Sequence, residues 1–289
     1  MQSSPLYRLR LPRRALARQA LGWGALAFAG LQGCTPAVSG PGSSTAERKP
    51  FGGERAAFGD AQGGRAVDET AGRCQHVPAS AADPLLADFE QDSVFIRPVP
   101  ERHGVWFVAN DGSPEGKQSP ESYSAEQGGY AGSNYAFHYR AEGFTEWGAV
   151  VGFQIRYAPA DGIRCPYNAT GYEGLSFVAR GQGRIRIKVG TPETTPSEEE
   201  GRCQRGCWDS HGVFVFLTEE WKEHRLPWSA FSQQGWGTVS RLNLNELLAI
   251  NFEIGRGDQP AEFWLDDVRF MAPGAAPVAP LPAPAAPVN

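Results

Sequence analysis

The sequence has 289 residues, a formal net charge of −5, 35 glycines, 23 prolines and only two methionines. This length allows one large or two small domains, and the weakly acidic balance argues against nucleic-acid binding, which needs a strongly basic surface. The frequent glycine, proline and aromatic residues favour short strands and turns over long helices. No run reaches the roughly 18 apolar residues that a bilayer-spanning helix needs.

Residues 1–33 have the layout of an export signal. Five arginines between positions 8 and 18 form a basic, acid-free start, and an apolar stretch over residues 20–31 follows. The stretch ends in Leu31-Gln32-Gly33-Cys34, which resembles the bacterial lipobox, whose cysteine is acylated and becomes the mature N-terminus. We therefore expect lipidation at Cys34, with plain secretion as the alternative and the export route, Sec or twin-arginine, left open.

Thr35, the residue after this cysteine, bears on the destination of the protein. A residue other than aspartate at this position resembles the pattern of Gram-negative lipoproteins that are sorted by default to the outer membrane. The expected location is thus the cell envelope, as an outer membrane lipoprotein facing either side. Acyl chains bury CH₂ groups at about 0.8 kcal/mol each, so dual acylation gives stable anchoring to the membrane.

Composition divides the remaining chain into three parts. Residues 34–80 are rich in Gly, Ala, Ser and Pro and predict a flexible tether, because they bury too little apolar surface to offset the entropy of ordering. Residues 273–289 are mostly Pro and Ala and predict a disordered tail. Residues 81–272 are of mixed composition and are long enough for one sandwich core.

The central region alternates apolar and polar residues with a period of two, between Gly, Pro, Asn and Asp turns. This pattern predicts half-buried antiparallel strands, and so many of them predict an all-β sandwich or jelly roll. A helical turn is expected only near 228–231, and Trp147 and Trp221 are expected in the core. The expected strands cover residues 135–140, 147–157, 175–179, 184–189, 213–217, 248–254 and 263–270.

Several segments of this region, in their order and spacing, resemble the galactose-binding-like jelly rolls of carbohydrate-binding modules, family 11 most of all. The resemblance covers about residues 83–271 and implies non-catalytic polysaccharide binding, with β-glucan as one ligand class, often beside a cellulase domain. The segments are Leu-Ala-Asp-Phe-Glu at 86–90, Gly-Ser-Asn-Tyr-Ala-Phe-His-Tyr at 132–139, Trp-Gly-Ala at 147–149, Tyr-Glu-Gly-Leu-Ser-Phe-Val-Ala-Arg-Gly at 172–181, Leu-Thr-Glu-Glu-Trp at 217–221, Leu-Pro-Trp-Ser-Ala-Phe at 226–231 and Phe-Trp-Leu-Asp-Asp-Val-Arg-Phe at 263–270.

The same resemblance implies a structural calcium ion between the first and last strands. Glu90 and Asp266 are the matching positions, and backbone carbonyls would complete the six to eight oxygen ligands that Ca²⁺ takes. Asp88, Asp92 and Asp267 are substitutes. The alternative is that these residues are surface acids or turn formers.

Four cysteines follow Cys34, and export makes disulfides the default. Three pairings of Cys74, Cys165, Cys203 and Cys207 are open. Cys203 with Cys207 would close a short loop, and Cys74 with Cys165 would pin the tether to the sandwich. A zinc site at Cys203, Cys207 and His211 is the weaker alternative, since it offers only three ligands at an uncommon spacing.

If the apolar alternation points inward, the polar rows point outward and form a candidate binding face. Planar polar groups bind sugar hydroxyls and aromatic rings bind their C–H surfaces, while several cations also suit an acidic polysaccharide. A solvated sheet face is the plain alternative. The candidates are His138, Arg140, Gln154, Arg156, Arg184, Arg186, Lys188, Asn251, Glu253 and Trp264, with Tyr157, Trp208 and Trp236 as further platforms on loops.

Catalysis is not predicted. No motif pairs two carboxylates as a glycosidase requires, and no nucleophile elbow, phosphate loop or HExxH helix occurs. The expected function is therefore polysaccharide binding by a lipid-anchored envelope protein. An envelope protein-interaction or adaptor module with a protein partner is the first alternative, and cellulase-type glucan degradation, by family association, is the second.

Overall fold

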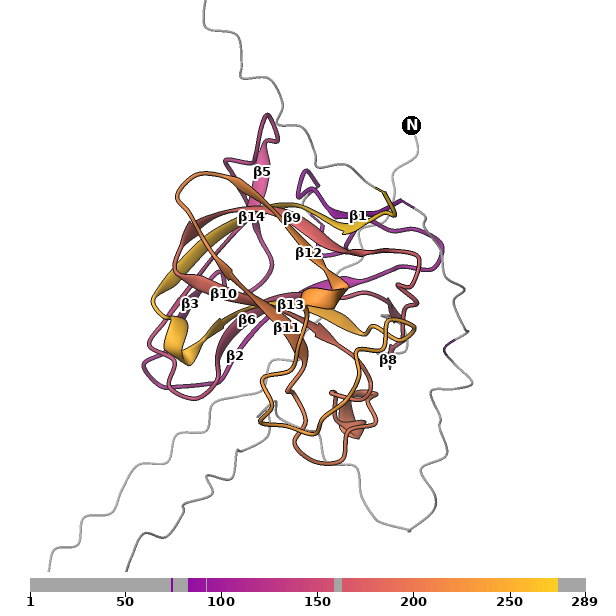
Figure 1. Ribbon diagram of the computed structural model, residues 1–289. Helices are drawn as coiled ribbons and strands as arrows, with labels where there is room; N and C mark the ends of the chain where they lie inside the picture. The colour runs from indigo at the N-terminus through magenta and orange to yellow at the C-terminus, as the bar shows by residue number, and fades with distance from the viewer. Residues whose placement is uncertain (1–73, 75–82, 92, 159–162, 275–289) are drawn as a thin grey trace, which may run out of the picture. The chain divides into compact units, whose positions relative to one another are not determined.

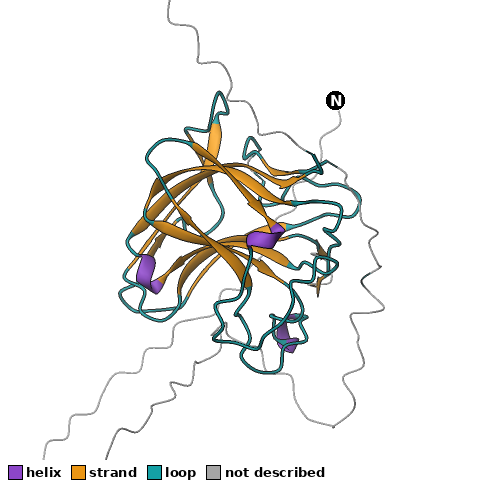
Figure 2. Ribbon diagram, viewed as in Figure 1, coloured by secondary structure: helices purple, strands orange, loops and turns teal. Residues whose placement is uncertain are grey.

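The structure, a computed structural model, describes residues 74, 83–91, 93–158 and 163–274. The predicted signal peptide, Cys34, most of the tether and the tail from residue 275 lie outside the described residues. Within those residues the chain is built almost wholly of antiparallel strands, which form two sheets and a short hairpin. The two sheets stack face to face as the layers of a sandwich (Figures 1 and 2). The predicted all-β jelly roll is confirmed.

The larger sheet, called sheet A, has the strand order β12-β9-β14-β5-β3, with β1 beside β14 and β4 beside β5. Its strands are β1 Leu85–Ala87, β3 Lys117–Ser119, β4 Ala125–Gln127, β5 Tyr135–Glu142, β9 Gly174–Gln182, β12 Lys222–Pro227 and β14 Ala261–Met271.

The second sheet, called sheet B, has the order β11-β10-β13-β6-β2, so that neighbours in space are mostly distant in sequence. The helical segments of the described chain are 3₁₀ turns of three residues, and none is long enough to cross a membrane. The strands and turns are β2 Val105–Asn110, β6 Gly148–Gln154, β10 Arg184–Gly190, β11 His211–Phe216 and β13 Ala249–Gly255, the hairpin β7 Tyr157–Ala158 and β8 Ile163–Arg164, and η1 Ser197–Glu199, η2 Trp228–Ala230 and η3 Arg256–Asp258.

One hydrophobic core fills the space between the sheets, and aromatic rings form much of it. Trp106 of β2 contacts Phe153 of the neighbouring β6, with 4.7 Å between ring centroids, and Phe137 of the opposite sheet, with 5.9 Å. Alternate residues of each strand point into this core, which is why a period of two in the sequence predicts the strands. The other alternate residues of each sheet therefore point outward.

Several strands and both tryptophans that were expected in the core depart from the sequence expectations. The alternation does not reveal β2 and β12, although β2 carries Trp106. Trp221 was expected in the core, but it is only half-buried, one residue before β12, and its ring lies 5.1 Å from the guanidinium carbon of Arg180. Trp147 is likewise half-buried at the start of β6. The helical turn expected near 228–231 is confirmed by η2.

Two disulfides select one of the three open pairings. Cys74 is bonded to Cys165, 91 positions along the chain, and Cys203 is bonded to Cys207. The first bond attaches a residue of the predicted tether to the sandwich. The second uses both thiols of the alternative zinc site, which is therefore wrong.

Candidate binding faces

The outward candidates fall on three separate parts of the sandwich, so they do not form one groove. His138, Arg140 and Trp264 lie on the outward side of sheet A, and Arg156 follows β6 at one end of the sandwich, where it lines a cavity of about 870 Å³. Trp264 therefore lies on the other sheet from Arg184 and Arg186. Six candidates share the outward side of sheet B, called here the sheet B face: Gln154, Arg184, Arg186, Lys188, Asn251 and Glu253.

Two glycines lie in the row of residues that crosses the middle of the sheet B face. Gly152 of β6 lies opposite Phe107 of β2 on one side and Asn251 of β13 on the other. Lys188 of β10 lies opposite Asn251 and Gly212 of β11. A Cβ on Gly152 would lie 2.4 Å from Oδ1 of Asn251, so the glycine leaves the space that this amide uses. The side chains of Asn251 and Phe107 therefore lie over the backbone of Gly152.

Exposed aromatic rings stand at the β11 edge of the sheet B face. Phe214 is 38% exposed, Phe216 is 70% exposed, and Trp236, from the loop before β13, is 43% exposed. The guanidinium carbon of Arg184 lies 4.3 Å from the Phe214 ring centroid and 6.0 Å from that of Phe216. Arg184 thus packs its cation against rings whose remaining surface faces solvent.

The cations of this face have partners of opposite charge. Lys188 Nζ donates to Oε2 of Glu253 at 2.7 Å, and Nε of Arg184 donates to Oδ1 of Asp258 at 2.7 Å. The pairs leave little net charge on the face. They still present donors and acceptors to a ligand, because a carboxylate accepts several hydrogen bonds and an ammonium donates three.

Arg186 serves the structure rather than the surface, since it is only 2% exposed. Its guanidinium donates to Oε1 of Gln234 at 2.7 Å and to the carbonyl oxygens of Ser210 and Ser232. Gln234 Oε1 also accepts a long hydrogen bond, of 3.4 Å, from Nε1 of Trp236. Arg186 therefore ties the loop that carries Trp236 to the β10–β11 edge of the face.

Asp209 holds the same loop from its other side. Its buried carboxylate accepts backbone N–H bonds from Gln234, Gly235 and Gly237, at 2.9, 2.8 and 3.1 Å. Burial opposes ionisation of Asp209, but these hydrogen bonds, with help from Arg186, outweigh it and lower the pKa of the carboxyl. Three donors that flank Trp236 thus converge on one anion.

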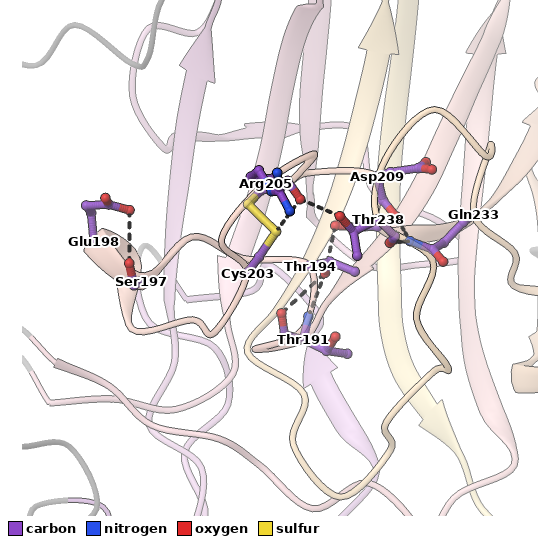
Figure 3. Close-up of a disulfide and its surroundings, with 11 residues drawn as sticks. Thr191, Thr194, Ser197, Glu198, Cys203, Arg205, Asp209, Gln233 and Thr238 are labelled. Carbon is purple, nitrogen blue, oxygen red and sulfur yellow. Dashed lines mark hydrogen bonds between the residues drawn. A yellow bond between two sulfur atoms is a disulfide. The ribbon is translucent and has the colours of Figure 1, made fainter. Parts of the chain in front are cut away.

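A layer of loops next to the Cys203–Cys207 disulfide completes this support (Figure 3). The Gln233 side chain donates to the carbonyl oxygens of Asp209 and Thr238, at 2.7 and 2.9 Å. The Thr238 hydroxyl donates to the carbonyl oxygen of Arg205, inside the loop that the disulfide closes. The position of Trp236 is therefore fixed by contacts between two loops and not by a regular element.

The outward side of sheet A, called here the sheet A face, is arranged differently. His138 is nearly buried between two acids: its Nδ1 lies 3.0 Å from Glu126 and its Nε2 lies 2.6 Å from Glu262. Its ring stacks on Trp264 with 4.1 Å between centroids. Both nitrogens and one face of His138 are thus already used by the chain.

Sequence reasoning missed some members of both faces. Phe214 and Phe216 belong to a stretch that is apolar on both sides, which is typical of a strand buried on both faces, although β11 is an edge strand. Arg180 of β9 lies outward two residues before the end of that strand, so its alternation with Ala179 is the signal that could have revealed it. Asp209 gives no such signal, because its partners are loop N–H groups.

The two acids proposed for calcium bind the chain's own donors. Glu90 accepts from the Ser133 hydroxyl and from the Asn134 and Tyr135 backbone, and Oδ2 of Asp266 accepts from the Tyr130 backbone at 2.9 Å. No three acids, histidines or cysteines of the described chain lie close enough to hold a metal ion. Both acids therefore fasten the loop over residues 128–135, and calcium binding between Glu90 and Asp266 stays a prediction.

The pKa values of these acids reflect their surroundings. Burial opposes ionisation of Glu90, but the hydrogen bonds from Tyr135, Asn134 and Ser133 outweigh it and lower the pKa of this carboxyl. Burial raises the pKa of Asp266 to about 6, although the N–H groups of Tyr130 and Asp267 act in the other direction.

We expect the melting temperature of the chain to be the same in calcium and in a chelator. Glu90→Gln should lower it by a few degrees in both buffers, since the amide offers fewer acceptor positions to the 133–135 segment; the loss is about 1 kcal/mol. Differential scanning calorimetry measures this, with Glu121→Gln, an exposed acid, as the control. A melting temperature that calcium raises in the wild type and not in Glu90→Gln would establish the calcium site.

Comparison with known proteins finds similarity in three dimensions and not in sequence. No protein-family profile matches the chain, and no curated protein matches it. The solved structures that are similar include the family 11 carbohydrate-binding module of the cellulosomal cellulase Lic26A-Cel5E of Clostridium thermocellum, with 15% identity and a TM-score of 0.41 over 67% of this chain and 96% of that chain.

The family 30 carbohydrate-binding module of the cellulosomal cellulase Cel9D-Cel44B of Clostridium thermocellum is another. It is 12% identical, with a TM-score of 0.44, over 66% of this chain and 99% of that chain. A third is the family 11 module of Clostridium thermocellum in complex with a β-1,3-1,4-mixed-linked tetrasaccharide, with 14% identity and a TM-score of 0.40 over 65% of this chain and 95% of that chain.

Proposed function

We propose that this chain is a non-catalytic carbohydrate-binding protein whose sheet B face binds a polysaccharide. The observation that carries the proposal is the grouping of three exposed rings, Phe214, Phe216 and Trp236, beside polar groups of the same face. Aromatic faces bind the C–H surfaces of pyranose rings, while Arg184 and the Lys188–Glu253 pair supply donors and acceptors for hydroxyl groups.

A neutral glycan suits this face better than an acidic one. Lys188 and Arg184 are each paired with a carboxylate, and Arg186 is buried under the loop that carries Trp236. A polyanion would therefore have to compete with Glu253 and Asp258 for these cations. β-Glucan is the neutral ligand that the sequence resemblance implies, and it is the specific ligand class we propose.

Affinity electrophoresis of the purified chain tests this function. We expect slower migration in gels that contain mixed-linkage β-glucan or xyloglucan and unchanged migration in polygalacturonate. Unchanged migration in every gel contradicts carbohydrate binding, and retardation in polygalacturonate alone contradicts a neutral ligand. Release of reducing sugar would point to a hydrolase, and stoichiometric capture of one protein from envelope extracts to the adaptor alternative.

We also propose that Cys34 is acylated and anchors the binding domain to the outer membrane. The basic start, the apolar stretch and the lipobox-like ending of residues 1–34 support this. Labelled palmitate should enter the protein in cells and fail to enter Cys34→Ser. An unlabelled wild-type protein that is released into the medium would contradict the anchor.

A further inference from the structure

Four planar side chains stand in a row across the sheet A face. His138 of β5 and Arg180 of β9 both lie opposite Trp264 of β14 in the strand register. Trp264 stacks on His138, and the guanidinium carbon of Arg180 lies 4.9 Å from the Trp264 ring centroid. The same carbon lies 5.1 Å from the ring centroid of Trp221, which precedes β12. The Arg180 guanidinium is thus held against two indole rings.

This guanidinium has hydrogen-bonding capacity that the protein does not use. Within the described part of the chain, Arg180 makes no ion pair and no side-chain hydrogen bond, and its Nε is buried without a partner. Ring contacts occupy the faces of a guanidinium, whereas its five N–H donors point outward in its plane. Contact with Trp221 and Trp264 therefore holds the guanidinium in place, while its two terminal nitrogens donate no hydrogen bond to the described residues.

A small cavity opens beside this group. Its volume is about 230 Å³, below the roughly 300–1,000 Å³ of pockets that hold drug-sized ligands. It offers donors from arginine, acceptors from two glutamates and both from a glutamine, next to an indole ring. The lining residues are Arg180, Gly181, Gln182, Glu219, Glu262 and Trp264.

The chemistry of this lining selects one kind of ligand. Sugar hydroxyl groups donate and accept hydrogen bonds, so they match a site with Arg180 donors and the acceptors of Glu219 and Glu262. Two carboxylates beside one guanidinium disfavour an anion such as a uronate. The volume suits about one monosaccharide.

We propose that the sheet A face holds a second carbohydrate site, which binds one neutral sugar residue at the edge of the Arg180 guanidinium. This site is separate from the sheet B face, because the hydrophobic core lies between the two sheets. Binding at this site depends only on the residues that line it and requires no ligand at Phe216 or Trp236. The chain would then bind glycans on both sides of the sandwich.

Titration of the full chain with neutral monosaccharides, namely glucose, galactose, mannose and xylose, tests the second site. We expect the indole N–H resonances of Trp221 and Trp264 to shift in ¹H–¹⁵N spectra with one of these sugars at millimolar concentration. Arg180→Gln should weaken this binding at least tenfold, and Arg140→Gln, on the same face but outside the cavity lining, should not. Gln182→Ala, an exposed lining residue, should also weaken it and covers the case in which Arg180→Gln misfolds.

The outcomes separate this site from the proposed function. Shifts that persist unchanged in Arg180→Gln, shifts seen with galacturonate only, or no shift of either resonance would overturn the second site. Trp236→Ala should leave the shifts of Trp221 and Trp264 intact. Shifts confined to Trp236 would overturn the second site and leave the sheet B proposal standing. Shifts confined to Trp221 and Trp264 would support the second site, and the migration in polysaccharide gels would still decide the sheet B proposal.

Discussion

Replacing both Trp236 and Phe216 with alanine should weaken polysaccharide binding about 30-fold or more while the melting temperature stays within a few degrees of the wild type. Truncation of an anchoring aromatic residue in a binding surface typically costs 2 kcal/mol or more, which corresponds to about this factor. Both side chains are exposed, at 43% and 70%, so their loss should leave the packing of the hydrophobic core unchanged. Affinity electrophoresis in mixed-linkage β-glucan and calorimetric melting measure the two quantities.

Phe95→Ala supplies the matched control for that experiment. Phe95 is 48% exposed and pairs with Val105 at the β2 edge of sheet B, the edge opposite β11. Its loss should change neither binding nor migration. If the Trp236 and Phe216 double variant migrates like the wild type in every glucan that retards the wild type, the ligand does not use these rings and the sheet B proposal fails.

Asp209→Asn should destabilise the domain by roughly 2–4 kcal/mol at neutral pH. The amide cannot accept all three N–H bonds from Gln234, Gly235 and Gly237, and a buried donor without a partner costs about 1–3 kcal/mol. For a domain of this size the melting temperature should fall by roughly 5–15 °C. Glucan affinity should fall as well, because the loop that carries Trp236 loses its anchor.

The effect of Asp209→Asn should depend on pH in one direction. The pKa of Asp209 in the folded chain is below its ordinary value of 3.8, so the carboxylate contributes stability above that value and loses it as the pH falls through the lower folded pKa. The difference in unfolding free energy between wild type and variant should therefore be constant from pH 7 to about pH 4 and shrink below it. Chemical denaturation at several pH values measures it, with Glu121→Gln as the control. Equal stability of wild type and Asp209→Asn at pH 7 would show that these N–H bonds contribute nothing.

Strands with one side in the core could be predicted from sequence, because their buried residues are apolar and recur at every second position. Examples are β5, β6, β10 and β13. β12 could not, since its inward residues include His224 rather than an aliphatic side chain. His224 packs on Phe177 with 5.2 Å between centroids, and burial, with Lys222 nearby, lowers the pKa of His224 to about 4. Its neutral ring fills a place that sequence patterns assign to apolar residues.

The candidate sites were harder to predict than the fold. Alternation shows that Arg184 and Trp264 point outward, but it does not show to which sheet each residue belongs. Sheet membership depends on strand pairs that are distant in sequence, such as β10 with β13 and β9 with β14. Six of the ten outward residues first proposed for the ligand nevertheless share one face. The rings of that face come from an edge strand and from a loop that Asp209 and Arg186 hold, and neither arrangement follows from a local pattern.

The bond between Cys74 and Cys165 has a mechanical consequence. Tension that reaches the domain from residues before Cys74 enters the sandwich through sulfur at Cys165 and bypasses residues 75–84. β1 is only three residues long and pairs with β14, so a pull directly on Leu85 would open that ladder one hydrogen bond after another. The cross-link directs the load past this short strand, so the pairing of β1 with β14 would survive a pull on the residues before Cys74.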